Sequence, residues 1–264
     1  MSIKKAVFKL KFKEFVAYRS NVYMNFMFGC VSIVIYLMLW KAIYGNNIKD
    51  LGGYSFKQMI TYYIIVSLLS VLLDSRDNTI KLSTMIEDGS IHNHLLKPIN
   101  FFKLDFMLYG AEKIIYFLNI IIPYGILCYI LRDSLFWKIE YIPFVMISVF
   151  FAFMLKYFLG CILGLLTTWI EELSGLLDLW KNIENFLDGK LIPLSILPKN
   201  IFTILSFLPF KYMLFVPVNI YMGNMDLNEI LQSLCIQLFW CLFLWGMLLL
   251  IKKKAFKKYS GYGS

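Results

Sequence analysis

A stripe of polar residues in the segment 171–190 is the part of the chain best suited to act on a hydrophilic molecule. Its members recur at steps of three and four residues, which places them on one face of a helix. They are Glu171, Ser174, Asp178, Lys181, Asn185 and Asp188. In a membrane each charge on a lipid-facing surface costs about 2.5–3.5 kcal/mol. The stripe must therefore face other helices or water.

Several kinds of chemistry fit such a stripe. Our main hypothesis is that it lines the path of a transported substrate. Alternatively, Asp178 or Asp188 neutralises Lys181 in a purely structural ion pair, or the segment lies at the membrane interface without crossing. An ion-coupled carrier would use Lys156 and Asp178 as relay groups. An intramembrane enzyme would use the clustered carboxylates Glu171, Glu172, Asp178 and Asp188.

The rest of the chain argues against catalysis. His92 and His94 are the only histidines and have no cysteine beside them, whereas a metal site needs three or four converging ligands. All five cysteines lie in apolar stretches without a C-x-x-C pair. No G-x-x-x-x-G-K-[ST] loop is present to bind nucleotide phosphates. We expect no metal and no cofactor on this chain, so any ATP-driven motor would be a separate polypeptide.

The elements that position the stripe are apolar helices. Five stretches are strongly apolar: 22–44, 54–74, 114–131, 141–170 and 230–251. About 20 such residues cross a bilayer core about 30 Å thick. With 59% hydrophobic residues and a mean hydropathy of +0.68, a soluble domain of 264 residues could not bury its apolar surface. Counting 173–189 as the fifth span in chain order, we predict an all-α, polytopic membrane protein with six transmembrane helices.

The basic residues predict the orientation. Of the 26 lysines and arginines, six lie in segment 1–21, four in segment 75–104 (among them Arg76) and five in segment 252–264. A chain with six spans has these three segments on the same side of the membrane. Positive charge marks the cytoplasmic side, so both termini are expected there. The net charge of +9 then reflects topology, and we expect no nucleic-acid partner. The segment 1–21 is expected to form an interfacial helix at the anionic inner surface, and no cleavable signal peptide is visible.

Prolines interrupt the segment after the stripe. Four of the seven prolines lie there: Pro193, Pro198, Pro209 and Pro217. Each removes a backbone donor and disrupts a helix, and the apolar piece 200–208 is too short to cross. We predict an external re-entrant region over 191–226, in which two short helices dip into the outer leaflet and return. Flat interfacial helices are the alternative.

The cytoplasmic loop 75–104 has the features of a short capped helix. Candidate N-caps are Asp77, Asn78 and Thr79, and the apolar side chains are Ile80, Met85 and Ile86. Gly89 suits the end of the helix and Pro98 prevents its continuation. Such a helix between two spans could transmit force from a cytoplasmic partner, or it could lie on the membrane. The spacing Gly160-x-x-x-Gly164 allows close helix packing, within the chain or in a dimer.

With these features, the chain resembles the permease subunits of ABC-2-type exporters in their six-span branch. The matching segments are LWKAIYG (39–45), IEDGSIHNHLLKPIN (86–100), GKLIPLSILP (189–198), LPF (208–210) and KKYSGYGS (257–264). Their order and spacing against the spans carry the resemblance, which covers essentially the whole chain. The chain ends in Gly-Ser where this family often has two glycines.

The resemblance implies one permease domain over 1–264 in a bacterial plasma membrane. Such permeases pair with an identical or related second permease and bind two ATPase subunits that carry ATP and Mg. The resemblance places a coupling helix at about 78–88, so the contacts to the ATPase would be Ile80, Met85, Ile86, Glu87, Asp88 and Gly89. It also places the substrate path between the two permeases, near the second and fifth spans. The path residues would then be Ser174, Asp178, Lys181, Asn185 and Asp188.

Overall fold

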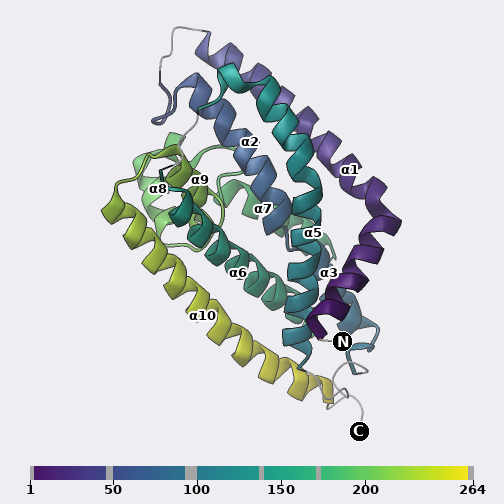
Figure 1. The fold of residues 1–264 in the computed structure, drawn as a ribbon. Helices are drawn as coiled ribbons and strands as arrows, with labels where there is room; N and C mark the ends of the chain where they lie inside the picture. Colours follow the sequence, from purple (N-terminus) through teal and green to yellow (C-terminus); the bar gives the residue numbers. More distant parts are fainter. Residues whose placement is uncertain (1–2, 46–49, 93–99, 137–139, 171–173, 261–264) are drawn as a thin grey trace.

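Long helices make up most of the protein. In a computed structural model, residues 3–45, 50–92, 100–136, 140–170 and 174–260 are described. The long helices are α1 (Ile3–Tyr44), α2 (Phe56–Leu73), α5 (Phe101–Ile130), α6 (Ile142–Leu166) and α10 (Leu227–Ser260). The shorter ones are α3 (Arg76–Glu87), α7 (Ser174–Leu187), α8 (Lys199–Ser206) and α9 (Phe215–Met222), with 3-10 turns η1 (Arg132–Ser134), η2 (Leu194–Ile196) and η3 (Phe210–Tyr212). No strand is found among these residues, so the all-α prediction is confirmed (Figure 1).

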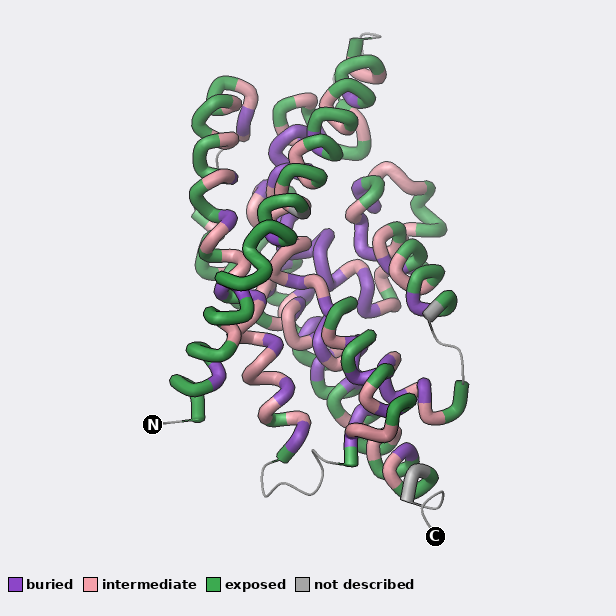
Figure 2. The backbone as a smooth tube through the Cα atoms, turned by 90° about the vertical axis from the view of Figure 1, so that its right-hand side faces the viewer, coloured by how far each residue is buried: buried purple, intermediate pink, exposed green. Residues whose placement is uncertain are grey.

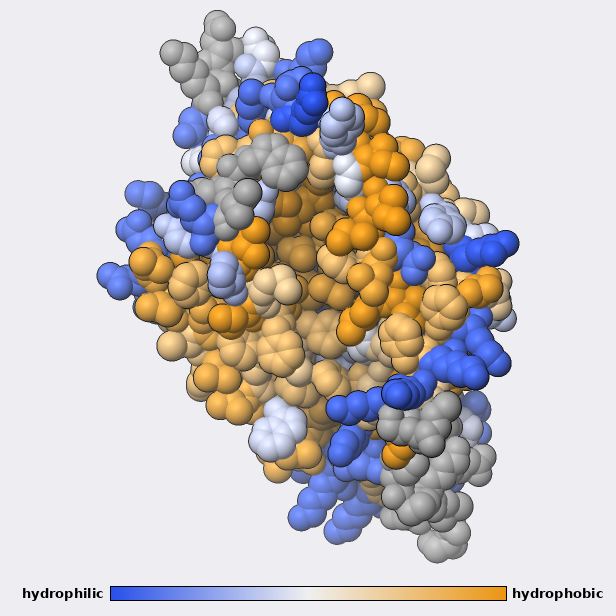
Figure 3. Space-filling view, viewed as in Figure 1, coloured by the Kyte–Doolittle hydropathy of each residue, from blue (hydrophilic) through white to orange (hydrophobic). Residues whose placement is uncertain are grey.

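Five helical stretches within the described residues are long and apolar enough to cross a membrane. They are Ile3–Tyr44, Phe56–Glu87, Phe101–Ile130, Ile142–Leu166 and Leu227–Lys258. Figure 3 shows a broad apolar area across the middle of the molecule, with hydrophilic side chains gathered around its edges, chiefly at the upper left and the lower right. These observations support a multi-pass membrane protein.

The predicted fifth span corresponds to α7, which is shorter than a membrane crossing. The helix has 14 residues, and a rise of 1.5 Å per residue gives it a length of about 21 Å, against about 30 Å of hydrocarbon. It is not one of the five stretches just named. The six-span count therefore stays a prediction.

The N-terminal segment and the first span are continuous in α1. The helix is kinked at Tyr18, where φ is −113° and ψ is 22°, and Figure 1 shows the bend. Before the kink, the ammonium of Lys11 donates a hydrogen bond to Glu112 of α5 at 2.7 Å. The kink separates the basic part of α1 from its apolar part, although an interfacial position for the basic part stays a prediction.

The beginning of α1, the end of α10 and α3 lie towards the same end of the molecule, opposite the end of α1 and the beginning of α2 (Figure 1). At that end the ammonium of Lys258 in α10 donates to the carbonyl of Thr168, just after α6, at 3.1 Å. This is the arrangement that a six-span chain with both termini on one side would have.

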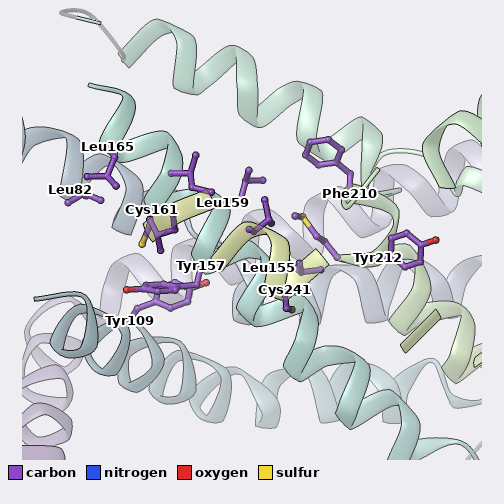
Figure 4. Close-up of a cluster of buried hydrophobic side chains, with 14 of the residues drawn as sticks. Leu82, Tyr109, Leu155, Tyr157, Leu159, Cys161, Leu165, Phe210, Tyr212 and Cys241 are labelled. Carbon is purple, nitrogen blue, oxygen red and sulfur yellow. The ribbon is translucent and has the colours of Figure 1, made fainter. Parts of the chain in front are cut away.

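Helix α6 forms the centre of the fold and packs against α3, α9 and α10. Figure 2 shows the buried residues concentrated on the inner helices, while the outer helices are exposed over much of their length. Leu155 and Leu165 of α6 are fully buried, and Leu165 lies beside Leu82 of α3 (Figure 4). The packing around α6 therefore fixes the position of α3.

The spacing Gly160-x-x-x-Gly164 serves a contact within this chain. A Cβ added to Gly160 would lie 2.7 Å from Thr79 Oγ1, and one added to Gly164 would lie 3.0 Å from Leu82. Both neighbours belong to α3, so the two glycines allow α3 to approach the backbone of α6. Of the two predicted alternatives, the structure has the intrachain contact.

The start of α3 differs from the prediction. The helix begins at Arg76 with Ser75 in the N-cap position, ahead of all three predicted caps. The Ser75 side chain makes no capping bond. Instead, the backbone N–H of Arg76 donates to Asp74 Oδ1 at 3.3 Å. The predicted end is confirmed, since Gly89 has a φ of +77°. Pro98 lies outside the described residues.

The proline-rich region forms short helices, each with a proline at its start. Pro193, Pro198 and Pro209 directly precede η2, α8 and η3, and Pro217 lies in the first turn of α9. At these positions the missing backbone donor costs little. The predicted pair of short helices is present as α8 and α9, and their re-entrant course stays a prediction.

Candidate functional site

The polar stripe of α7 is paired with other elements of this chain. Asp178 accepts a hydrogen bond from the guanidinium of Arg76 at the start of α3. The ammonium of Lys181 lies 2.9 Å from Asp74 Oδ1 at the end of α2. The structural alternative paired Lys181 with Asp178 or Asp188, and the structure pairs it with Asp74 instead. The stripe thus connects α7 to α2 and α3.

The centre of the site is a buried ion cluster between α6 and α7. The ammonium of Lys156 donates to Glu184 Oε1 at 2.6 Å and to Asp188 Oδ2 at 2.8 Å. Lys156 and Glu184 are each 4% exposed, and Asp188 is 1% exposed. Buried charges are stable only when they are paired and hydrogen-bonded. Lys156 therefore depends on both carboxylates.

Glu184 is a member of the site that the periodic stripe does not include. It lies three residues after Lys181, and its Oε2 is 3.8 Å from that ammonium. It therefore lies between the two cations of the site. The sequence feature that could have pointed to Glu184 is Lys156. This lysine is a charge in an otherwise apolar span, so it needs an acidic partner from another helix.

The remaining members of the stripe contribute less. Asn185 is partly exposed and lines a narrow cleft beside Asp74 and Lys190. Ser174 begins α7, and its side chain lies outside what the structure describes. Glu171 and Glu172 fall outside the described residues.

Part of the stripe opens onto a cavity of about 580 Å³ between α1, α2 and α5. Its wall combines apolar side chains with both signs of charge. The charged lining residues are Asp74, Arg76, Asp77, Lys113, Lys181 and Lys190. Basic groups outnumber acidic ones, so the cavity has the volume and polarity to hold a small hydrophilic group.

The face of α7 opposite the stripe is apolar and exposed. It consists of Leu176, Leu179, Ile183 and Phe186. Lys181, Glu184 and Asp188 turn towards α2 and α6, whereas the Asp178 side chain is 62% exposed beside Arg76 of α3. The apolar face is free to meet lipid or another chain. Asp178 is the exposed member of the polar face, and a contact of this face with a second permease stays a prediction.

The predicted coupling residues of α3 divide between its two faces. Ile86 is 7% exposed and packs in the core around α6, with Met85 partly buried beside it. Ile80 is 39% exposed. The exposed face of α3 consists of Arg76, Asp77, Ile80, Lys81, Thr84 and Glu87, followed by Asp88. Ile86 thus faces its own chain, and a partner would meet Ile80.

The end of α3 is a fixed turn. The backbone N–H of Ser90 donates to Asp88 Oδ1 at 2.8 Å, which lowers the pKa of Asp88. Gly89 supplies the left-handed conformation that the turn requires. The turn presents a carboxylate next to the exposed face of α3.

Among the described residues, no group of three or more His, Cys, Asp or Glu side chains could hold a metal ion. A family model described as ABC-2 family transporter protein matches residues 30–263. The match includes α2, α3, the ion cluster and the proline-rich region. No curated protein sequence matches the chain.

Proposed function

Because the chain belongs to the ABC-2 transporter family, we propose that it is the permease subunit of an ABC transporter that exports a substrate across the bacterial plasma membrane. ATP and Mg bind to separate ATPase subunits, and a second permease completes the path. The observation that carries this proposal is the family match over 30–263 in a chain without a nucleotide phosphate loop. The chain itself is then no enzyme.

The exposed face of α3 is the entry point of the mechanical force. The helix lies towards the end of the molecule where both termini lie (Figure 1). Behind that face, Gly160 and Gly164 hold α3 against α6, and Ser83 is hydrogen-bonded to Thr167 at 2.8 Å. Arg76 links α3 to α7 through Asp178. A displacement of α3 by an ATPase therefore reaches both helices of the ion cluster.

The fifth crossing is made by α7 together with the non-helical residues after it. The segment that contains α7 runs from one end of the molecule to the other. Before α7, Thr168 lies beside the end of α10. After α7, Ile196 lies beside the connection between α1 and α2, since a Cβ on Gly52 would be 2.8 Å from it. Unpaired carbonyls within a bilayer are costly. The hydroxyls of Tyr62 and Tyr63 donate to the carbonyls of Gly189 at 2.6 Å and Leu191 at 3.0 Å. These bonds support a broken crossing helix and hence six spans.

The substrate path follows the cavity beside Asp74 and Lys181 and continues past the ion cluster. In this arrangement Lys181 and Lys190 face the cavity, whereas Lys156 and Asp188 hold α7 in place. The charged residues of the site therefore differ in role, and those that line the cavity meet the substrate.

Copurification tests the function. We expect the ABC ATPase encoded beside this chain's gene to copurify with it in detergent, and the complex in liposomes to hydrolyse ATP. The chain alone should hydrolyse none, because it lacks a nucleotide site. Vesicle uptake that continues without any ATPase subunit would refute the proposal and favour an ion-coupled carrier.

Cysteine labelling tests the orientation. In a variant with all five native cysteines replaced, Asp133→Cys should react with a membrane-impermeant maleimide in intact cells, and Glu87→Cys only after lysis. The side chain of Asp133 is 95% exposed, and Glu87 lies on the exposed face of α3, so both thiols are accessible on their own sides. Labelling of Glu87→Cys in intact cells would show that the proposed topology is wrong.

A further inference from the structure

A second, larger cavity lies away from the ion cluster. It has a volume of about 890 Å³ and lies between α8, η3, α9 and the beginning of α10. Gly52 and Gly53 of the connection between α1 and α2 also line it, so it lies at the end of the molecule opposite the termini. In the proposed orientation this is the external side. The volume is that of a typical site for a small organic ligand.

The wall that α10 contributes changes in character along the helix. It is polar at Glu229, Gln232 and Ser233, and it becomes apolar at Ile236, Phe239 and Trp240. These positions share one helical face, and from the first to the last the helix rises about 16 Å. A wall with a polar and an apolar end is complementary to an amphiphile that lies along α10.

Lys211 provides a cation in the same cavity. Its ammonium donates to Ser206 Oγ at 2.7 Å and lies 4.1 Å from the ring centroid of Phe202. Among the described residues no carboxylate is paired with it, in contrast to Lys156 and Lys181. The Tyr212 ring lies 5.9 Å from the same ammonium. A partly buried ammonium with a hydroxyl and two rings as its neutral partners is a ready site for an anionic group.

Two further groups make the cavity selective. Glu229 lines it as well, and its Oε2 accepts a hydrogen bond from the backbone N–H of Asp226. The cavity thus offers one cation and one anion whose charges attract each other without a direct ion pair. Ser195 also lines it, and its buried Oγ has no hydrogen-bond partner among the described residues.

We propose that this cavity binds an amphiphile of the phosphatidylethanolamine type from the outer leaflet. Its phosphate pairs with Lys211, its primary ammonium approaches Glu229, and an acyl chain lies along Ile236, Phe239 and Trp240. The proposal requires the membrane orientation described above and is independent of ATP-driven export. The ligand is recognised by its adjacent opposite charges together with its apolar chain.

Native mass spectrometry of the purified chain, without ATPase or nucleotide, tests the proposal. The detergent contains equal amounts of phosphatidylethanolamine and phosphatidylglycerol. The wild-type chain should retain phosphatidylethanolamine in preference. Lys211→Gln should lower this occupancy about tenfold or more, since it removes a charge-assisted hydrogen bond. Glu229→Gln should remove the preference over phosphatidylglycerol while lipid is still retained.

Lys199→Gln is the matched control, because Lys199 is an exposed lysine at the start of α8, outside the cavity wall. It should retain lipid as the wild type does, and the melting temperatures of all variants show that they are folded. Equal occupancy in Lys211→Gln and the wild type would overturn the site. A wild-type preference for phosphatidylglycerol would overturn the zwitterionic ligand, and displacement by free phosphoethanolamine would overturn the role of the acyl chain.

Discussion

Replacing Lys156 by methionine is expected to destabilise the membrane domain strongly. The substitution keeps much of the side-chain volume but leaves Glu184 and Asp188 buried without their shared cation. Removing one partner of a buried ion pair costs about 3–5 kcal/mol, out of the roughly 5–15 kcal/mol that stabilises a typical domain. The yield of monodisperse protein in detergent and the midpoint of thermal unfolding measure the effect.

A triple variant separates lost charge from lost packing. Lys156→Met combined with Glu184→Gln and Asp188→Asn removes all three charges while keeping similar shapes, so it should recover most of the lost yield. Lys199→Met, at an exposed site, controls for the loss of a lysine and should unfold at the wild-type temperature. Wild-type yield from the single variant would contradict the buried cluster.

Transport by the triple variant then assigns roles within the site. If the triple variant folds and also transports the substrate, the cluster acts only to hold α7 against α6. If it folds without transporting, the charges themselves belong to the path. Asp178 and Lys181 keep their pairs with Arg76 and Asp74 in either case, although Glu184→Gln removes the charge 3.8 Å from Lys181.

The helical class and the polar face of α7 could be predicted from sequence, because both follow from periodicity. Long apolar stretches specify spans, and steps of three and four residues placed Asp178, Lys181 and Asp188 on one face. The partners of these residues come from α2, α3 and α6, far away in the chain, and no local pattern encodes such contacts. Glu184 was missed for this reason, since it becomes an ion-pair partner only because Lys156 lies opposite it on another helix.

Which face of α3 packs inward could not be predicted from the sequence, for a related reason. The helix carries apolar side chains on both faces, so periodicity alone does not separate the residues that pack inward from those that meet a partner. Gly160 and Gly164 determine which face packs inward, because only side chains as small as theirs allow Thr79 and Leu82 to contact the backbone of α6. Ile86 is buried as a consequence, and Ile80 is left at the surface.

The second large effect is expected at Ile80. Ile80→Asp should give a folded permease that no longer retains its ATPase subunits, because it places a charge in the apolar part of the exposed face of α3. Interface anchors contribute about 2 kcal/mol or more, which is about a 30-fold loss of affinity. The measurements are copurification of the ATPase and ATP hydrolysis by the complex in liposomes.

Ile142→Asp is the matched control for this experiment. Ile142 is 42% exposed, close to the 39% of Ile80, but it lies at the start of α6, far along the helix from Gly160 and Gly164. It should leave ATPase binding unchanged. Ile86→Asp gives the opposite contrast, because a charge at a residue that is 7% exposed should prevent folding altogether. If Ile80→Asp binds ATPase and transports as the wild type does, force enters elsewhere, and the basic beginning of α1 becomes the surface to test.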